Sequence, residues 1–254
     1  MLARATLESL LRERKLDTTL AVFPSLTATG ARRRDPDAQM PTGHARTDQC
    51  LDGGWPRGHL SMLSGPLSAG RTTLVIGTLA AATGGGELAA LVDAADRFDP
   101  VPAEARGVVL ARVLWVRGRV ADRSRLAHVP SGPSGHRRGD QWLTQSIRAF
   151  DLILRAGGFA VVVLDLSGVP PRALGGLPLT TWLRLGRSVE GSRTAALVVA
   201  DAPVARSAGG VSLELAPAPA RWRGTSARLF EGPSIAPRMR GFRKAALPTS
   251  GAGQ

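Results

Sequence analysis

From residue 60 onward, short apolar runs alternate with longer segments of helical periodicity. The runs at 60–64, 88–93, 113–116, 159–165 and 194–200 have the length of strands, and a further strand is expected at 211–215. Helices are expected at 74–82, 141–156 and 178–190. Continuous apolar strands that alternate with helices are typical of a parallel sheet covered on both faces. The pattern therefore predicts an α/β fold with a mainly parallel β-sheet and helices on both faces.

The segment before this core has a different pattern. Leu2, Leu7, Leu10 and Leu11 recur at helical spacing among charged residues, which predicts an amphipathic helix over 3–16. Prolines, glycines and a run of three arginines at 32–34 follow, and this composition is typical of a linker, although the arginines also suit an arm that binds nucleic acid. We expect an N-terminal helix and linker at 1–41, a core at 42–220, and a basic, partly disordered tail at 221–254.

A glycine-rich loop between the first strand and the first helix of the core carries the strongest chemical signal. A phosphate-binding loop needs glycines that let backbone N–H groups face an anion, a cation near the β- and γ-phosphates and a hydroxyl for Mg²⁺. Gly65, Gly70 and Thr72 meet this pattern, and Thr73 follows. Arg71 stands where the pattern has lysine, and its planar guanidinium does not simply replace a compact ammonium. A plain glycine-rich turn without a nucleotide is the alternative.

A carboxylate ends the apolar run at 159–165. In phosphate-loop proteins such a strand supplies an aspartate to the Mg²⁺ shell, so Asp165 is the candidate for that position. Gly65, Gly70, Arg71, Thr72, Thr73 and Asp165 together predict a degenerate nucleotide site. Whether it binds ATP and Mg²⁺ is left open by the residues.

Composition narrows the function classes. The 254 residues are 43% apolar and 21% charged, which supports a sizeable core. One cysteine, Cys50, excludes an internal disulfide, and we expect it to be a small buried side chain. Trp55, Trp115, Trp142 and Trp182 are expected to pack in or beside the core. Neither a secretory signal nor a membrane span is found, so a cytoplasmic protein without a membrane partner is expected.

The formal net charge of +13 points to an acidic partner. All basic residues except Lys15 and Lys244 are arginine, a bias that also fits coding composition. The excess is concentrated at 101–140 and 221–254, whereas 47–100 is net negative. Part of the first stretch, 106–138, is expected to be an exposed insertion.

The tail combines arginines with aromatic residues. This combination suits single-stranded nucleic acid, in which bases stack on rings and phosphates meet guanidinium groups, and it also suits a peptide that folds onto an acidic protein. The candidate contact residues are Arg221, Trp222, Arg223, Arg228, Phe230, Arg238, Arg240, Phe242, Arg243 and Lys244.

The order and spacing of several motifs resemble the core of the bacterial RecA recombinase. The resemblance rests on Thr42-Gly43, on LDGGWPRGHL at 51–60, on GPLSAGRTTL at 65–74, on LVDA at 91–94 and on Asp99-Pro100. It covers about residues 42–116 well and 140–215 loosely. It implies a RecA-like ATPase fold, with Asp165 at the position of the carboxylate associated with Mg²⁺.

Departures from that family's pattern change the expected function. The resemblance places Arg71 at the family's loop lysine, Ala95 at its catalytic glutamate and Asp201 at its nucleotide-sensing glutamine. An alanine cannot polarise water, and Asp96, the next residue, has a shorter side chain that points elsewhere. Only residues 201–210 separate two predicted strands, so the long loop with which RecA grips DNA is largely deleted.

A RecA-like core with these losses looks like the ImuA family of accessory proteins in bacterial mutagenesis cassettes. That resemblance implies a non-catalytic role in damage-induced (SOS) translesion synthesis. The implied partners are RecA, an ImuB-type Y-family polymerase homologue, the DnaE2-type polymerase and single-stranded DNA, with association with the nucleoid on DNA damage. Leu7, Leu10 and Leu11 are the candidate contact with RecA; packing of this stripe on its own domain is the alternative. An active DNA-dependent ATPase and a RecA-fold regulator without a DNA role are the rival functions.

Overall fold

The computed structural model describes residues 38–118, 133–205, 209–224 and 228–240. The predicted N-terminal helix with Leu7, Leu10 and Leu11 lies outside these ranges, and so do Phe242, Arg243 and Lys244. Part of the predicted insertion, at 119–132, also lies outside them, whereas 106–118 and 133–138 are described and include η3 (Leu110–Arg112), a strand at Val113–Arg117 and the start of a helix at Pro133–Ala156. The predictions on these residues stay predictions.

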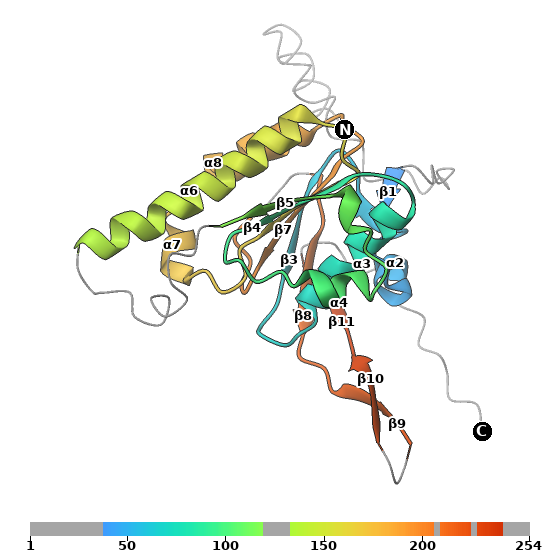
Figure 1. Cartoon of the computed structure of the whole chain (residues 1–254). Coiled ribbons are helices and arrows are strands. Elements are labelled where there is room, and N and C mark those ends of the chain that lie inside the picture. Colours follow the sequence, from blue (N-terminus) through green and yellow to red (C-terminus); the bar gives the residue numbers. More distant parts are fainter. Residues whose placement is uncertain (1–37, 119–132, 206–208, 225–227, 241–254) are drawn as a thin grey trace, which may run out of the picture. The chain divides into compact units, whose positions relative to one another are not determined.

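A seven-stranded sheet forms the centre of the described core (Figure 1). Its order is β11-β8-β3-β7-β6-β4-β5, and every neighbouring pair is parallel except β11 with β8. The predicted mainly parallel α/β sheet is confirmed. The strands are β3 (Leu60–Ser64), β4 (Ala89–Asp93), β5 (Val113–Arg117), β6 (Val161–Asp165), β7 (Ala195–Ala200), β8 (Ser212–Ala216) and β11 (Ala236–Met239).

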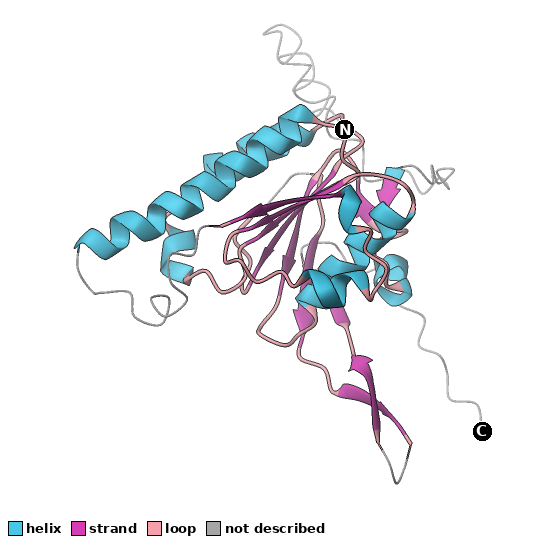
Figure 2. Cartoon of the chain, in the orientation of Figure 1, coloured by secondary structure: helices cyan, strands magenta, loops and turns pink. Residues whose placement is uncertain are grey.

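Helices cover both faces of this sheet (Figure 2). One face packs against α3 (Arg71–Gly84), and the other packs against α6 (Pro133–Ala156) and α8 (Leu179–Val189). Alternation along β6 explains how one strand serves both cores, because Val161 and Val163 join the first cluster and Val162 and Leu164 join the second. Short helices α4 (Pro100–Glu104), α7 (Pro171–Gly175) and the 3₁₀ turn η3 (Leu110–Arg112) complete the layers. None of the described helices is long and apolar enough to cross a membrane.

The residues before β3 close one side of the core. β1 (Gln39–Met40) pairs with β2 (Trp55–Pro56), and α2 (Ala45–Cys50) lies between them. Trp55 is fully buried, and its indole N–H donates to the Thr78 hydroxyl of α3 at 3.1 Å. Cys50 is exposed at the end of α2, so the prediction that it is buried is wrong. A six-residue helix covers the core with one face only, and Cys50 lies on the other.

The other three tryptophans expected in or beside the core do pack there, but they are buried to different extents. Trp182 is buried on α8, whereas Trp115 on β5 and Trp142 on α6 are partly buried and pack against the two core clusters. β5 is the last strand of the sheet, which leaves one of its sides without a neighbouring strand among the described residues.

Three strands lie in the described residues between 220 and 240. β9 (Ala220–Arg223) and β10 (Leu229–Pro233) form an antiparallel hairpin, and β11 then returns into the main sheet beside β8. The sheet thus continues past the boundary at 220 that the sequence predicts. Antiparallel pairing explains the difference, because β11 is a short edge strand without the apolar run that marks the buried strands.

Candidate functional site

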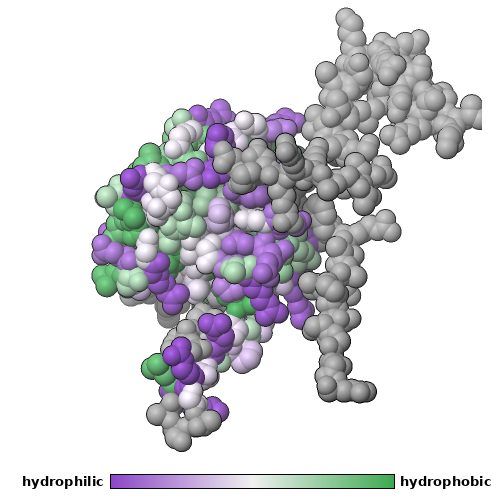
Figure 3. Space-filling view, turned by 90° about the vertical axis from the view of Figure 1, so that its right-hand side faces the viewer, coloured by the Kyte–Doolittle hydropathy of each residue, from purple (hydrophilic) through white to green (hydrophobic). Residues whose placement is uncertain are grey.

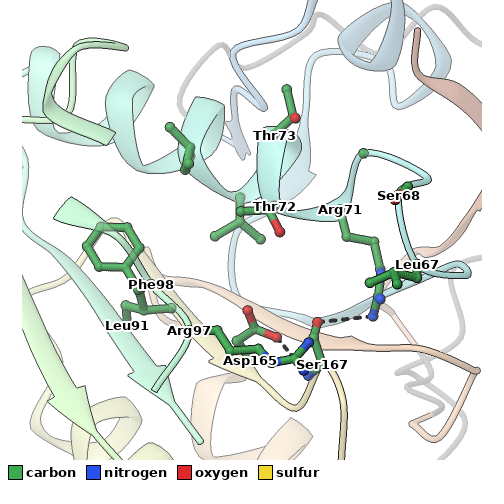
Figure 4. Close-up of a pocket in the computed structure, with 13 residues that line it drawn as sticks. Leu67, Ser68, Arg71, Thr72, Thr73, Leu91, Arg97, Phe98, Asp165 and Ser167 are labelled. Atoms are coloured by element: carbon green, nitrogen blue, oxygen red, sulfur yellow. Dashed lines mark hydrogen bonds between the residues drawn. The ribbon is translucent and has the colours of Figure 1, made fainter. Parts of the chain in front are cut away.

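The glycine-rich loop connects β3 to α3 at the carboxyl edge of the sheet (Figure 4). Gly70 caps α3 with φ +97°, a left-handed conformation that favours glycine, and its carbonyl accepts from the Leu74 N–H at 3.0 Å. Gly65 lies against β8, where a Cβ would meet the Leu215 carbonyl oxygen at 2.7 Å. The glycines therefore provide tight backbone geometry at both ends of the loop, which is the scaffold of a phosphate-binding turn.

Arg71, the first residue of α3, contacts the connections that follow β6 and β7. Its guanidinium pairs with an Asp201 carboxylate oxygen at 2.5 Å and donates to the Ser167 hydroxyl at 3.0 Å. The Arg71 side chain is 6% exposed, so the pair is largely withdrawn from water on the arginine side. The loop arginine thus ties the start of α3 to the residues that follow β6 and β7.

Asp165 ends β6 beside this ion pair. Its Oδ1 accepts from the Ser167 N–H at 2.8 Å, and the Asp201 carboxylate accepts from the Gly168 N–H at 3.2 Å. Burial raises the pKa of Asp165, the neighbouring Asp93 raises it further, and the bonds to Ser167 and the charge of Arg71 oppose the shift.

Asp93 lies next to Asp165 in register, at the end of β4. It is 1% exposed; its Oδ2 accepts from the Phe98 N–H at 2.7 Å, and its Oδ1 has no hydrogen-bond partner among the described residues. The carboxyl ends of β4 and β6 therefore bring a buried carboxyl group, Asp93, and a partly buried one, Asp165, side by side.

The position of the family's glutamate is occupied by Ala95, and its neighbour Asp96 is engaged elsewhere. Both Asp96 oxygens accept from the Arg117 guanidinium, at 2.8 and 2.9 Å, and the bond to Asp96 raises the pKa of Arg117. Arg117 also lies over the Trp115 ring, 4.6 Å from its centroid. Arg117 of β5 therefore holds the Asp96 carboxylate, so Asp96 does not replace the glutamate that the family pattern has at the position of Ala95.

A cavity of about 310 Å³ opens beneath the start of α3 (Figure 4). The structure brings most of the predicted nucleotide residues to it, since Gly70, Arg71, Thr72, Thr73 and Asp165 all line it. Gly65 does not line it and shapes the other end of the loop. Ser167, Arg97 and Phe98 also line the cavity and were not identified from the sequence, because no short motif marks them.

These residues do not fit a hydrolytic Mg²⁺–ATP site. The Thr72 hydroxyl is exposed at the start of α3, but the loop cation is committed to Asp201 and Ser167, and no carboxylate stands at 95. Within the described ranges, no group of three or more His, Cys, Asp or Glu side chains is arranged to hold a metal ion. The fold of the site is that of a phosphate loop, whereas its loop cation, Arg71, is paired with Asp201 of the same chain.

The predicted tail residues are not part of this cavity. Arg221, Trp222 and Arg223 lie on β9, and Arg228 directly precedes β10. Arg238 lies on β11, and Arg240, just after it, pairs with Glu214 at 2.5 Å. They form a separate cluster on the segment that leaves and re-enters the sheet.

Comparison with known proteins finds similarity to RecA. The family model of the RecA N-terminal domain matches residues 24–121. RecA of Clavibacter michiganensis subsp. michiganensis is 31% identical over 170 residues, which are 64% of this chain and 41% of that protein. RecA of Methylococcus capsulatus is 35% identical over 142 residues, which are 55% of this chain and 34% of that protein. RecA of Salinispora tropica is 31% identical over 170 residues, 64% of this chain and 42% of that protein.

The matched segment thus spans 34% to 42% of the length of these curated relatives. The similarity and the sheet together support a RecA-like α/β core. The predicted resemblance to RecA is confirmed at this level.

Proposed function

We propose that this RecA-like chain is a non-catalytic accessory protein of damage-induced (SOS) mutagenesis and translesion DNA synthesis, of the ImuA kind. In this role the core is a scaffold for contacts, and the phosphate loop is kept as architecture rather than as a site of turnover. The three residues that depart from the RecA pattern, Arg71, Ala95 and Asp201, support this proposal.

The Arg71–Asp201 ion pair carries the proposal. Its two members stand at the lysine and glutamine positions of the RecA pattern, and in the structure they contact each other at 2.5 Å. The cation that would meet the β- and γ-phosphates is therefore neutralised within the chain, and a nucleotide would have to compete with Asp201 for it. A site in which the protein supplies its own counterion has no need of ATP to hold these elements together.

The proposed partners are RecA, an ImuB-type Y-family polymerase homologue and the DnaE2-type polymerase. The proposal of these partners derives from the resemblance to ImuA and from a core that keeps its scaffold without the catalytic groups. The leucine stripe Leu7, Leu10 and Leu11 is the proposed contact with RecA.

Turnover is the property that tests the non-catalytic proposal. We expect the full chain to release no phosphate above background from Mg²⁺–ATP, with or without single-stranded DNA, and Asp165→Asn to change nothing. Phosphate release that Asp165→Asn abolishes would overturn the proposal in favour of an active DNA-dependent ATPase.

A matched variant tests the role of the ion pair. Arg71→Lys with Asp201→Gln restores the residues that the RecA pattern has at both positions. We expect this double variant to bind a fluorescent ATP analogue more tightly than the unaltered chain, because its loop cation is no longer held by a carboxylate. Tighter binding by the unaltered chain would contradict the proposed self-neutralised site.

The partner contact has its own test. We expect the full chain to bind purified RecA and the purified ImuB-type protein, and Leu7→Asp with Leu11→Asp to abolish binding to RecA while circular dichroism stays unchanged. Undiminished binding of RecA by the folded variant would refute the leucine contact, and failure of the chain to bind either protein would refute the proposed partners.

A further inference from the structure

The helices α6 and α8 cover the face of the sheet opposite α3 (Figure 1). Each leads into a parallel strand, β6 or β7, so both run opposite to the strands and parallel to each other. The Ser188 hydroxyl of α8 donates to Asp151 of α6 at 2.8 Å and joins the two helices. Their apolar stripes pack on the sheet. Exposed residues of the outer stripes form what we call the α6–α8 face: Arg148, Leu152, Arg155, Leu183, Arg184 and Arg187.

Leucines on this face are exposed to water, although both helices already bury an apolar stripe against the sheet. Leu152 of α6 is 67% exposed, and Leu183 of α8 is 46% exposed. Leu179, one turn before Leu183, is 60% exposed. Several large apolar side chains exposed on one layer of helices are typical of a contact surface. A partner that covers them has to offer apolar side chains.

Arginines surround these leucines, and Asp151 is the only acidic side chain described within the two helices. Arg155 pairs with Asp151 at 3.1 Å. Arg148, Arg184 and Arg187 are exposed, and none of them forms an ion pair with a described residue. Because the helices are parallel, Arg148 and Arg184 stand at the same level, one turn before the contact between the helices. Two like charges at one level repel each other, and an external anion would relieve that repulsion.

The chain itself is a poor source of this anion. A symmetric dimer through the α6–α8 face would bring its arginines against each other. The sequence outside the described ranges is net basic in each of its three long segments, at 1–37, 119–132 and 241–254. The β9–β10 hairpin, which Figure 3 shows as a projection with a mainly hydrophilic surface, also carries arginines. The complementary charge therefore has to come from another molecule.

We infer that the α6–α8 face binds an acidic segment of another protein. Its carboxylates would meet Arg148 and Arg184, since arginine binds a carboxylate through two parallel N–H bonds, and its aliphatic side chains would cover Leu152 and Leu183. Nucleic acid would satisfy the arginines, but its bases stack on aromatic rings, whereas the large exposed apolar side chains described on this face are leucines. A membrane surface requires a continuous apolar band, whereas arginines separate the leucines here.

This inference goes beyond the proposed function and does not rest on it. The α6–α8 face lies on the side of the sheet opposite α3, so the contact requires neither the Arg71–Asp201 pair nor a nucleotide in the cavity. Substitutions on α6 and α8 leave the cavity residues and the leucine stripe at the N-terminus unaltered. Failure of this inference is therefore distinguishable from failure of the proposed function.

Fluorescence anisotropy of a labelled helical peptide of glutamate, alanine and leucine with the full chain tests the inference. We expect Arg148→Gln with Arg184→Gln to weaken binding about tenfold, because two charge-assisted hydrogen-bond donors are lost. Arg46→Gln with Arg106→Gln removes the same charge from exposed positions on α2 and after α4, and we expect a change below about twofold. Equal losses in the two double variants, or no binding of the peptide by the unaltered chain, would overturn the assignment to this face.

Leucine variants separate apolar contact from charge. We expect Leu152→Ser with Leu183→Ser to weaken binding of the peptide about tenfold. Val101→Ser with Leu229→Ser alters exposed apolar side chains elsewhere, and we expect a change below about twofold. Equal losses in these two double variants would overturn the apolar contact.

Competition identifies the class of partner. We expect the unlabelled peptide to displace the labelled one more effectively than oligo-dT or phosphatidylserine vesicles of equal negative charge do, because only the peptide covers the leucines. Displacement that is as effective with either competitor would overturn the choice of a protein partner. Unchanged thermal unfolding of each variant confirms that the fold is intact.

Discussion

Arginine is used in two opposite ways at the carboxyl edge of the sheet. Arg71 is 6% exposed and forms an ion pair with a carboxylate of its own chain, whereas Arg221 and Arg228 on the hairpin are exposed and form no ion pair with a described residue. A buried cation without a counterion is costly, so the loop arginine requires Asp201. Arg221 and Arg228 remain exposed to water. The net charge of +13 therefore includes both a buried, paired arginine and exposed arginines.

Removing the counterion of Arg71 is expected to have the largest effect on stability. Loss of one partner from a buried pair costs about 3 to 5 kcal/mol, and because Asp201 is 42% exposed we expect about 2 kcal/mol for Asp201→Asn. Urea unfolding monitored by circular dichroism measures it. Arg155→Gln breaks an exposed pair with Asp151 on α6 and is expected to cost less than about 0.5 kcal/mol. Similar losses of stability in the two variants would show that the Arg71–Asp201 pair stabilises the fold no more than the Arg155–Asp151 pair does.

Gly70 connects the two regions, because it caps α3 and lies against Ile235 beside the hairpin. We expect Gly70→Ala to lower the free energy of unfolding by about 1 to 2 kcal/mol, since φ of +97° disfavours a residue with a Cβ and that Cβ would meet Ile235 at 3.2 Å. Gly84→Ala is the control, because a Cβ there meets nothing within 4 Å. It is expected to be neutral or to stabilise by about 0.5 kcal/mol. A larger loss at Gly84 than at Gly70 would contradict the strained cap.

Asp165 makes the stability of the loop region depend on pH. Its pKa is raised in the folded protein, so the folded chain holds a proton that the unfolded chain has already released. Stability is therefore lost as pH rises from the unfolded value of about 3.8 through the folded value. We expect Asp165→Asn to gain stability relative to the unaltered chain over that range, in urea unfolding at pH 4 to 7.5. A difference that does not change with pH would contradict the raised pKa.

The smallest effect on stability is expected at the hairpin. Arg221→Gln removes an exposed charge without an ion-pair partner among the described residues, so the free energy of unfolding should change by less than about 0.5 kcal/mol. A loss of stability comparable with that of Asp201→Asn would show that the hairpin arginine supports the fold rather than a partner contact.

Much of the candidate site follows from local sequence. The glycine spacing places Gly70, Thr72 and Thr73 at the start of a helix, and the apolar run before Asp165 places that carboxyl group at the end of a strand. Parallel strands bring such ends to one edge, so the approach of Gly70, Thr72, Thr73 and Asp165 to one cavity could be predicted. Ser167 and Arg97 could not, because they lie in connections after strands where no periodicity or motif fixes the direction of a side chain.

The amino-acid sequence by itself predicted the parallel α/β core and the phosphate-loop turn. Its resemblance to RecA also identified the positions at which the catalytic groups of the RecA pattern are replaced. These features depend on strand and helix patterns that neighbouring residues set. Only the tertiary structure decided that the replacements Arg71 and Asp201 meet, that Asp96 is held by Arg117, and that Trp222 stands on a hairpin rather than in a tail. Ion pairs between residues more than a hundred positions apart depend on how strands are ordered in the sheet, and β7 reaches the loop because it pairs directly with β3.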